Sequence, residues 1–415
     1  MIEIKPAQVT LNSICKCGSK DLIFGEIIWQ GQHVCVDITC KNCNKNFLQN
    51  IPTGQSLLET RIVEKDTKSV YKLDWQPSKD AWLNKPLSSI LTPVKDDISL
   101  NVQVNTHNKK IIILNCLEFV YGHAVLVLFN LQRIIKLNSN STLGIVVIIQ
   151  PMFKWMLPQE GIAEIWTVNT SFKQMTYYNE CLNMAIHKEL QRFEQVFLSH
   201  GHLIPTNTPI NIQEFTKIPP FNFDIPPTRP RITFIWRQDP GRLWIRNIYI
   251  LKGFEKLGLK KILLPFHYLR IVTLFFFLKK EFGNRFIYTV AGFGKWMLFP
   301  KFITDARTND FNDDTERFLC QIYSESELII GVHGSSMILP SAHAGMCISL
   351  MPSKRWGNFA EDILFSPSET DVRLAAFQKR IIPINLCIFD IIDICINMLK
   401  GRMYFLKKFK HSNEL

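Results

Sequence analysis

Short, continuous runs of apolar residues alternate with longer segments of helical periodicity in the middle of the chain. The runs at 111–114, 144–149 and 164–168 have the length and composition of buried strands. The segments at 121–137 and 178–198 carry apolar stripes that are typical of amphipathic helices. Strands that alternate with helices predict a parallel sheet, and we expect a Rossmann-like domain over residues 110–217.

The same alternation returns in the second half of the chain. Strands are predicted at 231–236, 285–290, 328–332 and 346–351, and helices at 244–257, 261–282, 315–323 and 386–399. Between the two sets, residues 218–230 (IPPFNFDIPPTRP) carry prolines that cannot continue a helix or a central strand. This segment is therefore the predicted interdomain linker, and a second Rossmann-like domain is expected at 231–400, followed by a basic tail at 401–415.

Two close cysteine pairs mark the N-terminal segment. Cys15 and Cys17 are separated from Cys40 and Cys43 by a hairpin-length insert, which predicts a tetrahedral site for a structural Zn²⁺. The insert itself predicts two strands, at 22–30 and 33–39, joined by a turn. We therefore expect a small β zinc ribbon over residues 1–50. Such a module has too little core to fold alone, so the metal would supply its stability.

The ribbon leaves other interpretations open. Cys35 is expected to be a spare buried thiol, His33 is a candidate substitute ligand, and the four cysteines can also be free thiols. A ribbon can bind nucleic acid, bind a protein partner or only brace the chain. Residues 51–109 mix short alternating segments with turns and predict a connector with a few strands, in which Trp75 and Trp82 are packing anchors.

Composition places the chain among folded proteins. Its 415 residues are 47% hydrophobic and 20% charged, which predicts ample core and about two or three domains. The net charge of +12 can indicate nucleic acid, an anionic membrane, an anionic ligand or only a compositional bias toward lysine. No lysine and arginine run with interleaved aromatic residues appears, so nucleic acid is the least favoured partner. The basic tail can contact an anionic membrane surface or be a solvated end.

No signal sequence is predicted at the N-terminus, where the first residues are polar and mixed. The most apolar segment, 261–278, is interrupted by Pro265, His267 and Arg270 and predicts a buried helix rather than a membrane span. Eleven cysteines, an odd number, fit reduced thiols better than a disulfide framework. We expect a cytoplasmic protein that can be peripheral to the inner membrane face.

Basic and backbone anion-binding groups follow four predicted strands of the second domain. The carboxyl ends of parallel strands meet at one edge of a sheet, which is where α/β proteins bind ligands. Arginine grips phosphate with two parallel hydrogen bonds, and a helix N-terminus adds backbone N–H groups. The edge therefore predicts a diphosphate site, although surface salt bridges are the alternative for the arginines. Its predicted members are Arg237, Arg242, Lys295, His333, Gly334, Ser335 and Ser336, with Lys354 and Arg355 beside them.

Glu361 follows the last of these strands and is a candidate partner for ribose hydroxyls, although it can equally be a helix cap. The chain carries no Walker lysine motif, no G-x-G-x-x-G after the first strand and no Asp-x-Asp pair. The absence of these motifs disfavours a kinase, an NTPase and a simple dehydrogenase.

The segment 330–337 (IGVHGSSM), with Leu339-Pro340 and Gly345 after it, resembles the G-V-H-G-A-G-L…P-x-G signature of glycosyltransferase family 61. The resemblance covers roughly the second half of the chain, and the helix at 121–124 (YGHA) is loosely similar to one in the first domain of those enzymes. The chain departs from the signature in having Ser335-Ser336 where Ala-Gly is usual.

The resemblance implies a GT-B fold and inverting transfer from a nucleotide sugar bound by the second domain. We expect the acceptor, a glycan or glycolipid, on the side of the first domain. We also expect transfer without a metal ion, because fixed cations and a helix N-terminus can stabilise the diphosphate leaving group. The resemblance also implies that His333, Gly334 and Ser335 border the donor and that Arg237 lies at its diphosphate. An inverting enzyme needs a base for the acceptor proton, and His123 and Asp239 are the candidates. His123 can equally be a structural histidine, and Asp239 can serve only to pair with the arginines. The rival hypothesis is a non-catalytic binding protein whose zinc ribbon recruits nucleic acid or a protein partner.

Overall fold

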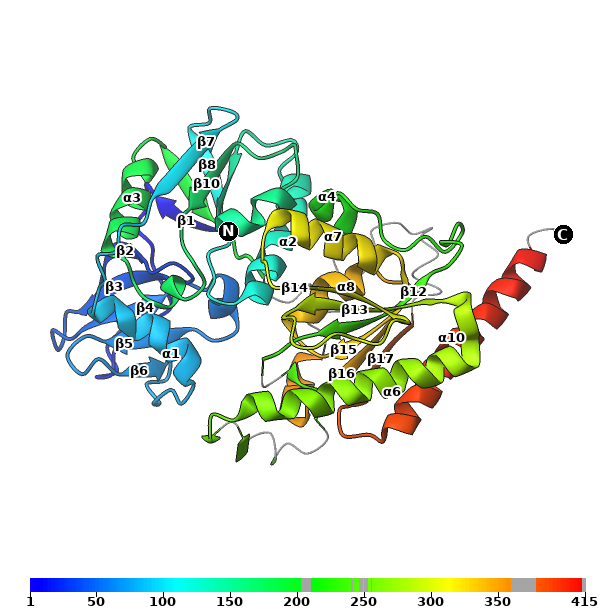
Figure 1. Ribbon diagram of the computed structural model, residues 1–415. Helices are drawn as coiled ribbons and strands as arrows, with labels where there is room; N and C mark the ends of the chain where they lie inside the picture. Colours follow the sequence, from blue (N-terminus) through cyan, green and yellow to red (C-terminus); the bar gives the residue numbers. More distant parts are fainter. Residues whose placement is uncertain are drawn as a thin grey trace. The chain divides into compact units, whose positions relative to one another are not determined.

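The structure is a computed structural model, and it describes residues 1–202, 210–239, 242–245, 249, 253–254, 256–359 and 378–412. The chain folds into two units, Met1–Thr206 and Asn207–Leu415 (Figure 1). Each unit contains a six-stranded sheet with a parallel centre, and the first also contains a five-stranded antiparallel sheet. The prediction of an α/β protein with two Rossmann-like sheets and a cysteine-bearing β module at the N-terminus is thus confirmed.

The parallel sheet of the first unit has the strand order β1-β11-β8-β9-β10-β7. Strands β8 to β11 are parallel and follow the first half of the Rossmann order, whereas β1 and β7 close the two edges in antiparallel. The helices of this unit are α1 (Ala81–Ser88), α2 (Tyr121–Leu137) and α3 (Glu180–Leu190). The strands are β1 (Ile2–Lys5), β7 (Leu100–Val104), β8 (Lys110–Asn115), β9 (Gly144–Ile149), β10 (Glu164–Val168) and β11 (Gln195–Leu198).

The antiparallel sheet is larger than the predicted hairpin. It is a meander of β2 (Leu22–Trp29), β3 (Val34–Cys40), β4 (Asn46–Asn50), β5 (Arg61–Glu64) and β6 (Val70–Lys72). Part of its buried residues share a hydrophobic cluster with the parallel sheet: Trp29 and Ile38 pack in the same core as Trp166 of β10. The sheet is therefore joined to the core of the first unit.

The sheet of the second unit is parallel throughout, with the order β14-β13-β12-β15-β16-β17. In chain order this is 3-2-1-4-5-6, the order of a dinucleotide-binding Rossmann sheet, whose ligands lie where the order reverses. In this sheet the order reverses between β12 and β15. The strands are β12 (Arg231–Trp236), β13 (Ile287–Phe293), β14 (Ile303–Thr308), β15 (Ser326–Val332), β16 (Met346–Met351) and β17 (Gln378–Pro383).

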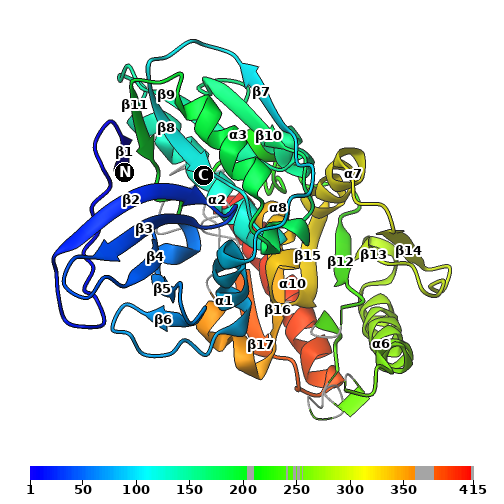
Figure 2. The same ribbon diagram turned by 90° about the vertical axis from the view of Figure 1, so that its left-hand side faces the viewer.

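Helices cover both faces of this second sheet. Helices α6 (Leu264–Phe282) and α10 (Ile388–Ser412) pack together on one face, and α7 (Asp313–Ser324) and α8 (Ile338–His343) pack together on the other (Figures 1 and 2). A short helix, α4 (Ile212–Thr216), precedes the sheet. The helix α10 extends to Ser412, beyond the predicted end at 399, and carries the buried Arg402, which pairs with Glu327 of β15.

Two element predictions differ from the structure, and a third is not tested by it. The segment 178–198, predicted as one helix, is α3 followed by the strand β11, because a four-residue strand with alternating buried residues mimics the end of a helical stripe. The edge strands β14 and β17 were not predicted, because their polar residues leave no continuous apolar run of the length of a strand. The predicted helix at 244–257 lies largely outside the described residues.

One helix in the described part of the chain, within Lys261–Arg285, is long and apolar enough to cross a membrane by length and composition. Only 39% of its most apolar window is buried. Its inner residues Ile271, Phe275 and Leu278 are fully buried in the core of the second unit. A core helix passes the same test, so this finding alone does not indicate a span.

Candidate functional site

The four predicted metal ligands come together beside the antiparallel sheet. Their Sγ atoms all lie within 4.8 Å of one another, with Cys15 3.5 Å from Cys43 and Cys17 3.7 Å from Cys40. Four thiolates arranged as a tetrahedron around Zn²⁺, with bonds of about 2.3 Å, lie about 3.8 Å apart. The cluster therefore has the size and the ligand set of a structural zinc site and can hold a metal ion.

Tight turns shape the two cysteine knuckles. The N–H group of Gly18, at φ +86°, donates to the Cys15 carbonyl, and the N–H group of Asn44, at φ +57°, donates to the Cys40 carbonyl. A backbone hydrogen bond from Ser19 lowers the pKa of Cys17 to about 6, whereas burial raises the pKa of Cys15 to about 12. A bound cation would remove this difference, because coordination deprotonates a thiol.

The two alternative ligands of the ribbon lie apart from the cluster. Cys35 is buried in a small core with Leu48 and Val63. His33 is buried with its Nδ1 3.0 Å from the Ser56 hydroxyl, and burial lowers its pKa to about 3. Neither belongs to the group of four.

Two predicted anion-binding segments meet at the switch point of the second sheet. Arg242 follows β12, His333 follows β15, and these two strands are neighbours. Arg242 Nη1 donates to the His333 carbonyl, and Arg355 Nη1, from the 3₁₀ helix Ser353–Asn358 after β16, donates to the same carbonyl at 3.2 Å. One carbonyl therefore fixes guanidinium groups from two other strand ends beside it.

Gly334 makes this approach feasible. Its φ is +139°, and a Cβ atom added there would lie 1.6 Å from Arg242 Nη1. Next to it, the buried His333 ring has its Nε2 3.0 Å from the Asn358 carbonyl, so this nitrogen carries the proton and donates. The glycine at position 334 is thus tied to the position of Arg242.

Arg237, the first residue after β12, pairs with Asp239. The guanidinium Nε lies 2.7 Å from Asp239 Oδ2, and the Arg237 side chain is about one-third exposed. This ion pair favours the alternative interpretation of Asp239, as the partner of Arg237.

The remaining predicted members lie at the same edge with weaker attachments. Lys295 is exposed, and its backbone N–H donates to Asn309 Oδ1 at 2.8 Å. Ser335 and Ser336 are half-buried in a 3₁₀ turn, Ser335–Met337, that leads into the six-residue α8. Because α8 is so short, its dipole adds little, and the positive charge of the site comes from the arginines. Glu361 lies outside the described residues.

The first unit presents a buried acid and imidazole at the corresponding position of its own sheet. Glu118 follows β8, the first strand of the parallel order, and its Oε2 lies 3.8 Å from His123 Nδ1 in the first turn of α2. Within the described residues neither atom has a hydrogen-bond partner. Burial raises the pKa of Glu118 well above its usual value and lowers the pKa of His123 to about 4. The imidazole of His123 is therefore uncharged near neutral pH, and burial favours the protonated form of Glu118.

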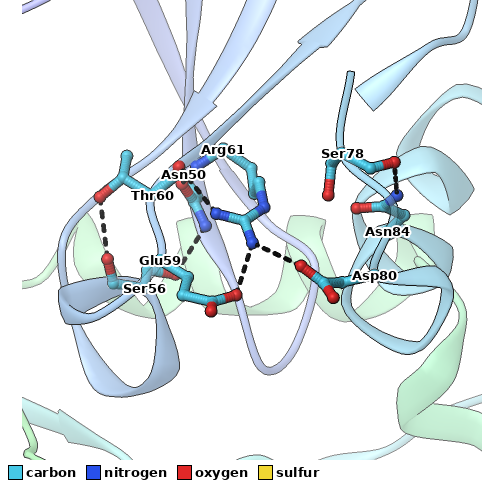
Figure 3. A network of polar contacts seen from close by, with 8 residues as sticks. All are labelled: Asn50, Ser56, Glu59, Thr60, Arg61, Ser78, Asp80 and Asn84. Atoms are coloured by element: carbon cyan, nitrogen blue, oxygen red, sulfur yellow. Dashed lines mark hydrogen bonds and ion pairs between the residues drawn. The ribbon is translucent and has the colours of Figure 1, made fainter. Parts of the chain in front are cut away.

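Trp82 borders this pair. Its ring centroid lies 5.8 Å from that of His123, and 45% of its surface is exposed. Helix α1, which carries Trp82, is held by a polar network in which the buried Arg61 of β5 pairs with Asp80 at 3.1 Å (Figure 3). Arg61 also pairs with Glu59, and its backbone N–H donates to Asn50 Oδ1 at 2.7 Å. The antiparallel sheet thus positions an exposed aromatic ring beside the acid and imidazole.

Sequence reasoning did not select Glu118, Trp82 or the role of Arg355. Glu118 had a usable signal, since it is an acidic residue just after a buried strand. Sequence reasoning also missed Arg307. Its buried guanidinium lies 4.9 Å from the Trp236 ring and pairs with Asp305 at 2.8 Å. Arg307 lies near the end of β14, a strand that the pattern did not predict.

Comparisons with known proteins add little to this picture. The sequence matches no known protein family, and no curated protein matches it. Among solved structures, the chain is similar to the pneumococcal O-GlcNAc transferase GtfA in complex with UDP and GlcNAc. That similarity has a TM-score of 0.22 and 10% sequence identity, and it covers 94% of this chain and 80% of that one. At this level it carries no weight for fold or function, which rest on the topology and residues above.

Proposed function

We propose that the chain is a glycosyltransferase that takes a sugar from a nucleotide-sugar donor held at the switch point of the second sheet. The supporting observation is the meeting of Arg242 with the carbonyl of His333, next to Gly334, where the 3-2-1-4-5-6 order reverses. A guanidinium has five N–H donors, so the bond to His333 orients Arg242 and leaves donors for a phosphate.

The chemistry of sugar transfer explains why fixed cations belong there. As the bond between the anomeric carbon and the diphosphate breaks, negative charge develops on the leaving phosphate. Arg237 and Arg242 would stabilise that charge without a metal ion, because guanidinium groups remain protonated at every physiological pH. Arg237, kept near the strand end by Asp239, would contact the outer phosphate.

An inverting transfer also needs a group to accept the proton of the attacking hydroxyl. We propose His123 for this role in the first unit, where the carboxyl group of Glu118 lies beside its ring. An uncharged imidazole keeps one ring nitrogen free to accept a proton. The exposed face of Trp82 would stack against an acceptor sugar. A glycan or glycolipid acceptor in polysaccharide biosynthesis fits these groups.

We further propose that the four cysteines hold a structural Zn²⁺ with no part in the chemistry. The cluster lies in the sheet that supplies Arg61, and Arg61 holds the start of the helix that carries Trp82. The metal would thus support the acceptor side only through the fold.

A donor panel tests the proposed function. Thermal unfolding of the full chain is recorded with UDP-, GDP-, CMP- and dTDP-sugars, and release of the nucleoside diphosphate is then followed for any sugar nucleotide that stabilises the protein. We expect stabilisation by one class and slow hydrolysis that His123→Ala reduces. A well-folded sample that no sugar nucleotide stabilises would count against the donor site.

A further inference from the structure

Helix α6 is apolar on its outer face as well as on its inner face. Phe266, Leu269 and Phe276 are 59%, 56% and 56% exposed, although each is a large hydrophobic residue. They are three and seven positions apart, so they lie on one stripe of the helix, opposite the buried Ile271 and Phe275. A helix that only covers a soluble core carries polar residues on such a stripe.

The exposed apolar surface continues on both sides of α6. On one side, Tyr268 Oη donates to the Leu298 carbonyl at 3.0 Å, which ties the loop of Trp296, Met297 and Leu298 to the helix. Leu298 is 83% exposed. On the other side, the exposed Phe389 of α10 packs against Phe277, with ring centroids 5.5 Å apart. We call this surface, made of Phe266, Leu269, Phe276, Trp296, Met297, Leu298 and Phe389, the α6 surface.

The segment that carries most of the α6 surface is strongly basic. Residues 256–301 contain nine lysines and arginines and a single acidic residue, Glu281. Glu281 is paired with Lys400 of α10, so its charge is compensated within the unit. Exposed lysines, among them Lys261, Lys280 and Lys295, lie on the same helix and loop as the apolar side chains.

We infer that the α6 surface docks the protein on an anionic phospholipid membrane. Aromatic and aliphatic side chains enter the boundary between headgroups and acyl chains, while the lysines bind the anionic headgroups. The helix lies on the membrane and does not cross it, because its inner face is part of the core of the sheet. Charge complementarity favours a lipid over a second copy of this chain, since two such surfaces would repel each other.

The surface is distinct from the C-terminal basic segment. Basic residues around the start of that segment are used within the unit: Lys400, which precedes it, pairs with Glu281, and the buried Arg402 pairs with Glu327 and stacks on Phe223. Membrane contact through α6 therefore does not need this segment to be free. The inference also stands apart from the proposed catalytic function.

The experiment is co-sedimentation of the full chain with vesicles of phosphatidylcholine alone and of phosphatidylcholine with about one-third phosphatidylglycerol. We expect binding to the anionic vesicles only, weakened by salt. Phe276→Asp should reduce the affinity roughly tenfold or more, because it removes an exposed aromatic side chain that would enter the membrane and adds a negative charge. Lys280→Glu should weaken binding to anionic vesicles through charge alone.

Phe318→Asp is the matched control, because Phe318 is 56% exposed on α7, on the opposite face of the same sheet. It should bind vesicles as the unmodified chain does, and circular dichroism should show both variants folded. Failure of the unmodified chain to bind anionic vesicles at low salt would overturn the inference. So would a Phe276→Asp variant that binds normally, or one that converts a dimer in solution to a monomer.

Discussion

The guanidinium of Arg242 donates a hydrogen bond to the backbone carbonyl of His333, and these two residues follow the two neighbouring strands between which the order of the second sheet reverses. Arg355 binds the same carbonyl from a third strand end. A main-chain acceptor cannot rotate away as a side chain can, so the position of Arg242 is set by the strand β15 itself. This arrangement preorganises a cation at the edge where α/β sheets bind ligands.

The close approach of Arg242 makes Gly334 sensitive to substitution. Gly334→Ala places a Cβ atom against the guanidinium at a φ of +139°, and a non-glycine residue in that region costs about 1 to 3 kcal/mol. We expect a lower free energy of unfolding, measured by denaturant titration, and weaker sugar-nucleotide binding. In an Arg242→Ala background the same substitution should cost less stability, because the steric conflict is gone. Equal costs in both backgrounds would argue against the contact.

The cysteine cluster predicts a defined metal content. We expect elemental analysis of the purified chain to find about one zinc per chain, and Cys40→Ser or Cys43→Ser to abolish it. Loss of the metal should lower the stability of the first unit by an amount on the order of several kcal/mol. Cys181→Ser, at an exposed thiol outside the cluster, is the control and should keep its zinc. A folded, metal-free natural chain would contradict the site.

Because Glu118 is buried, we predict that the protein loses stability as the pH rises above the usual pKa of a glutamate. The pKa of Glu118 is raised in the folded state because the carboxyl group is buried, so folding favours the protonated form. The stability it contributes is present below its usual pKa and is lost as the pH rises toward the raised one, by about 1.4 kcal/mol for each pH unit. Glu118→Gln cannot titrate. The variant should therefore gain stability relative to the unmodified chain as the pH rises above the usual pKa of a glutamate in urea titrations, and parallel profiles would contradict this account.

Because His267 is buried, we predict that the protein loses stability as the pH falls below the usual pKa of a histidine. Burial lowers the pKa of His267 to about 3, with Arg270 and Arg307 nearby, and its Nδ1 accepts the N–H of Trp244 at 3.1 Å. The unfolded chain binds a proton below about pH 6.5 that the folded chain does not, so stability falls with falling pH, by roughly 2 to 3 kcal/mol at pH 4.5. His267→Asn should flatten this slope in denaturant titrations, even if the variant is less stable at pH 7. His107→Asn, at an exposed histidine, should leave the slope unchanged.

The parts of the fold that could be predicted from the sequence are those with an unmixed pattern. The buried strand β9 and the helix α2 have the predicted bounds, because their apolar residues are uninterrupted or fall on one stripe. The strands β10 and β16 also have the predicted bounds, since most of their residues are apolar. The edge strand β14 was not predicted, because Thr304 and Asp305 interrupt its apolar residues. An edge strand needs only one buried face.

Some features of the candidate site could likewise be predicted from the sequence, and others could not. Cys15, Cys17, Cys40 and Cys43 are brought together by local turns and one hairpin, so their spacing was sufficient to predict the cluster. The placement of Arg242 and His333 at one sheet edge followed from the strand pattern. The contact between them, the arrival of Arg355 and the burial of Glu118 beside His123 depend on tertiary packing, which no local pattern carries.

The central claim, a sugar-nucleotide diphosphate bound by Arg237 and Arg242, is tested most directly by calorimetric titration of the sugar nucleotide that best stabilises the chain. We expect micromolar to millimolar binding by the unmodified chain. Arg242→Ala should weaken it about tenfold to a hundredfold, as for the loss of a charged hydrogen bond of roughly 1.5 to 3 kcal/mol. Lys301→Ala, at an exposed lysine away from the site, is the control. Binding that is unchanged in a folded Arg237→Ala, Arg242→Ala double variant would contradict the account.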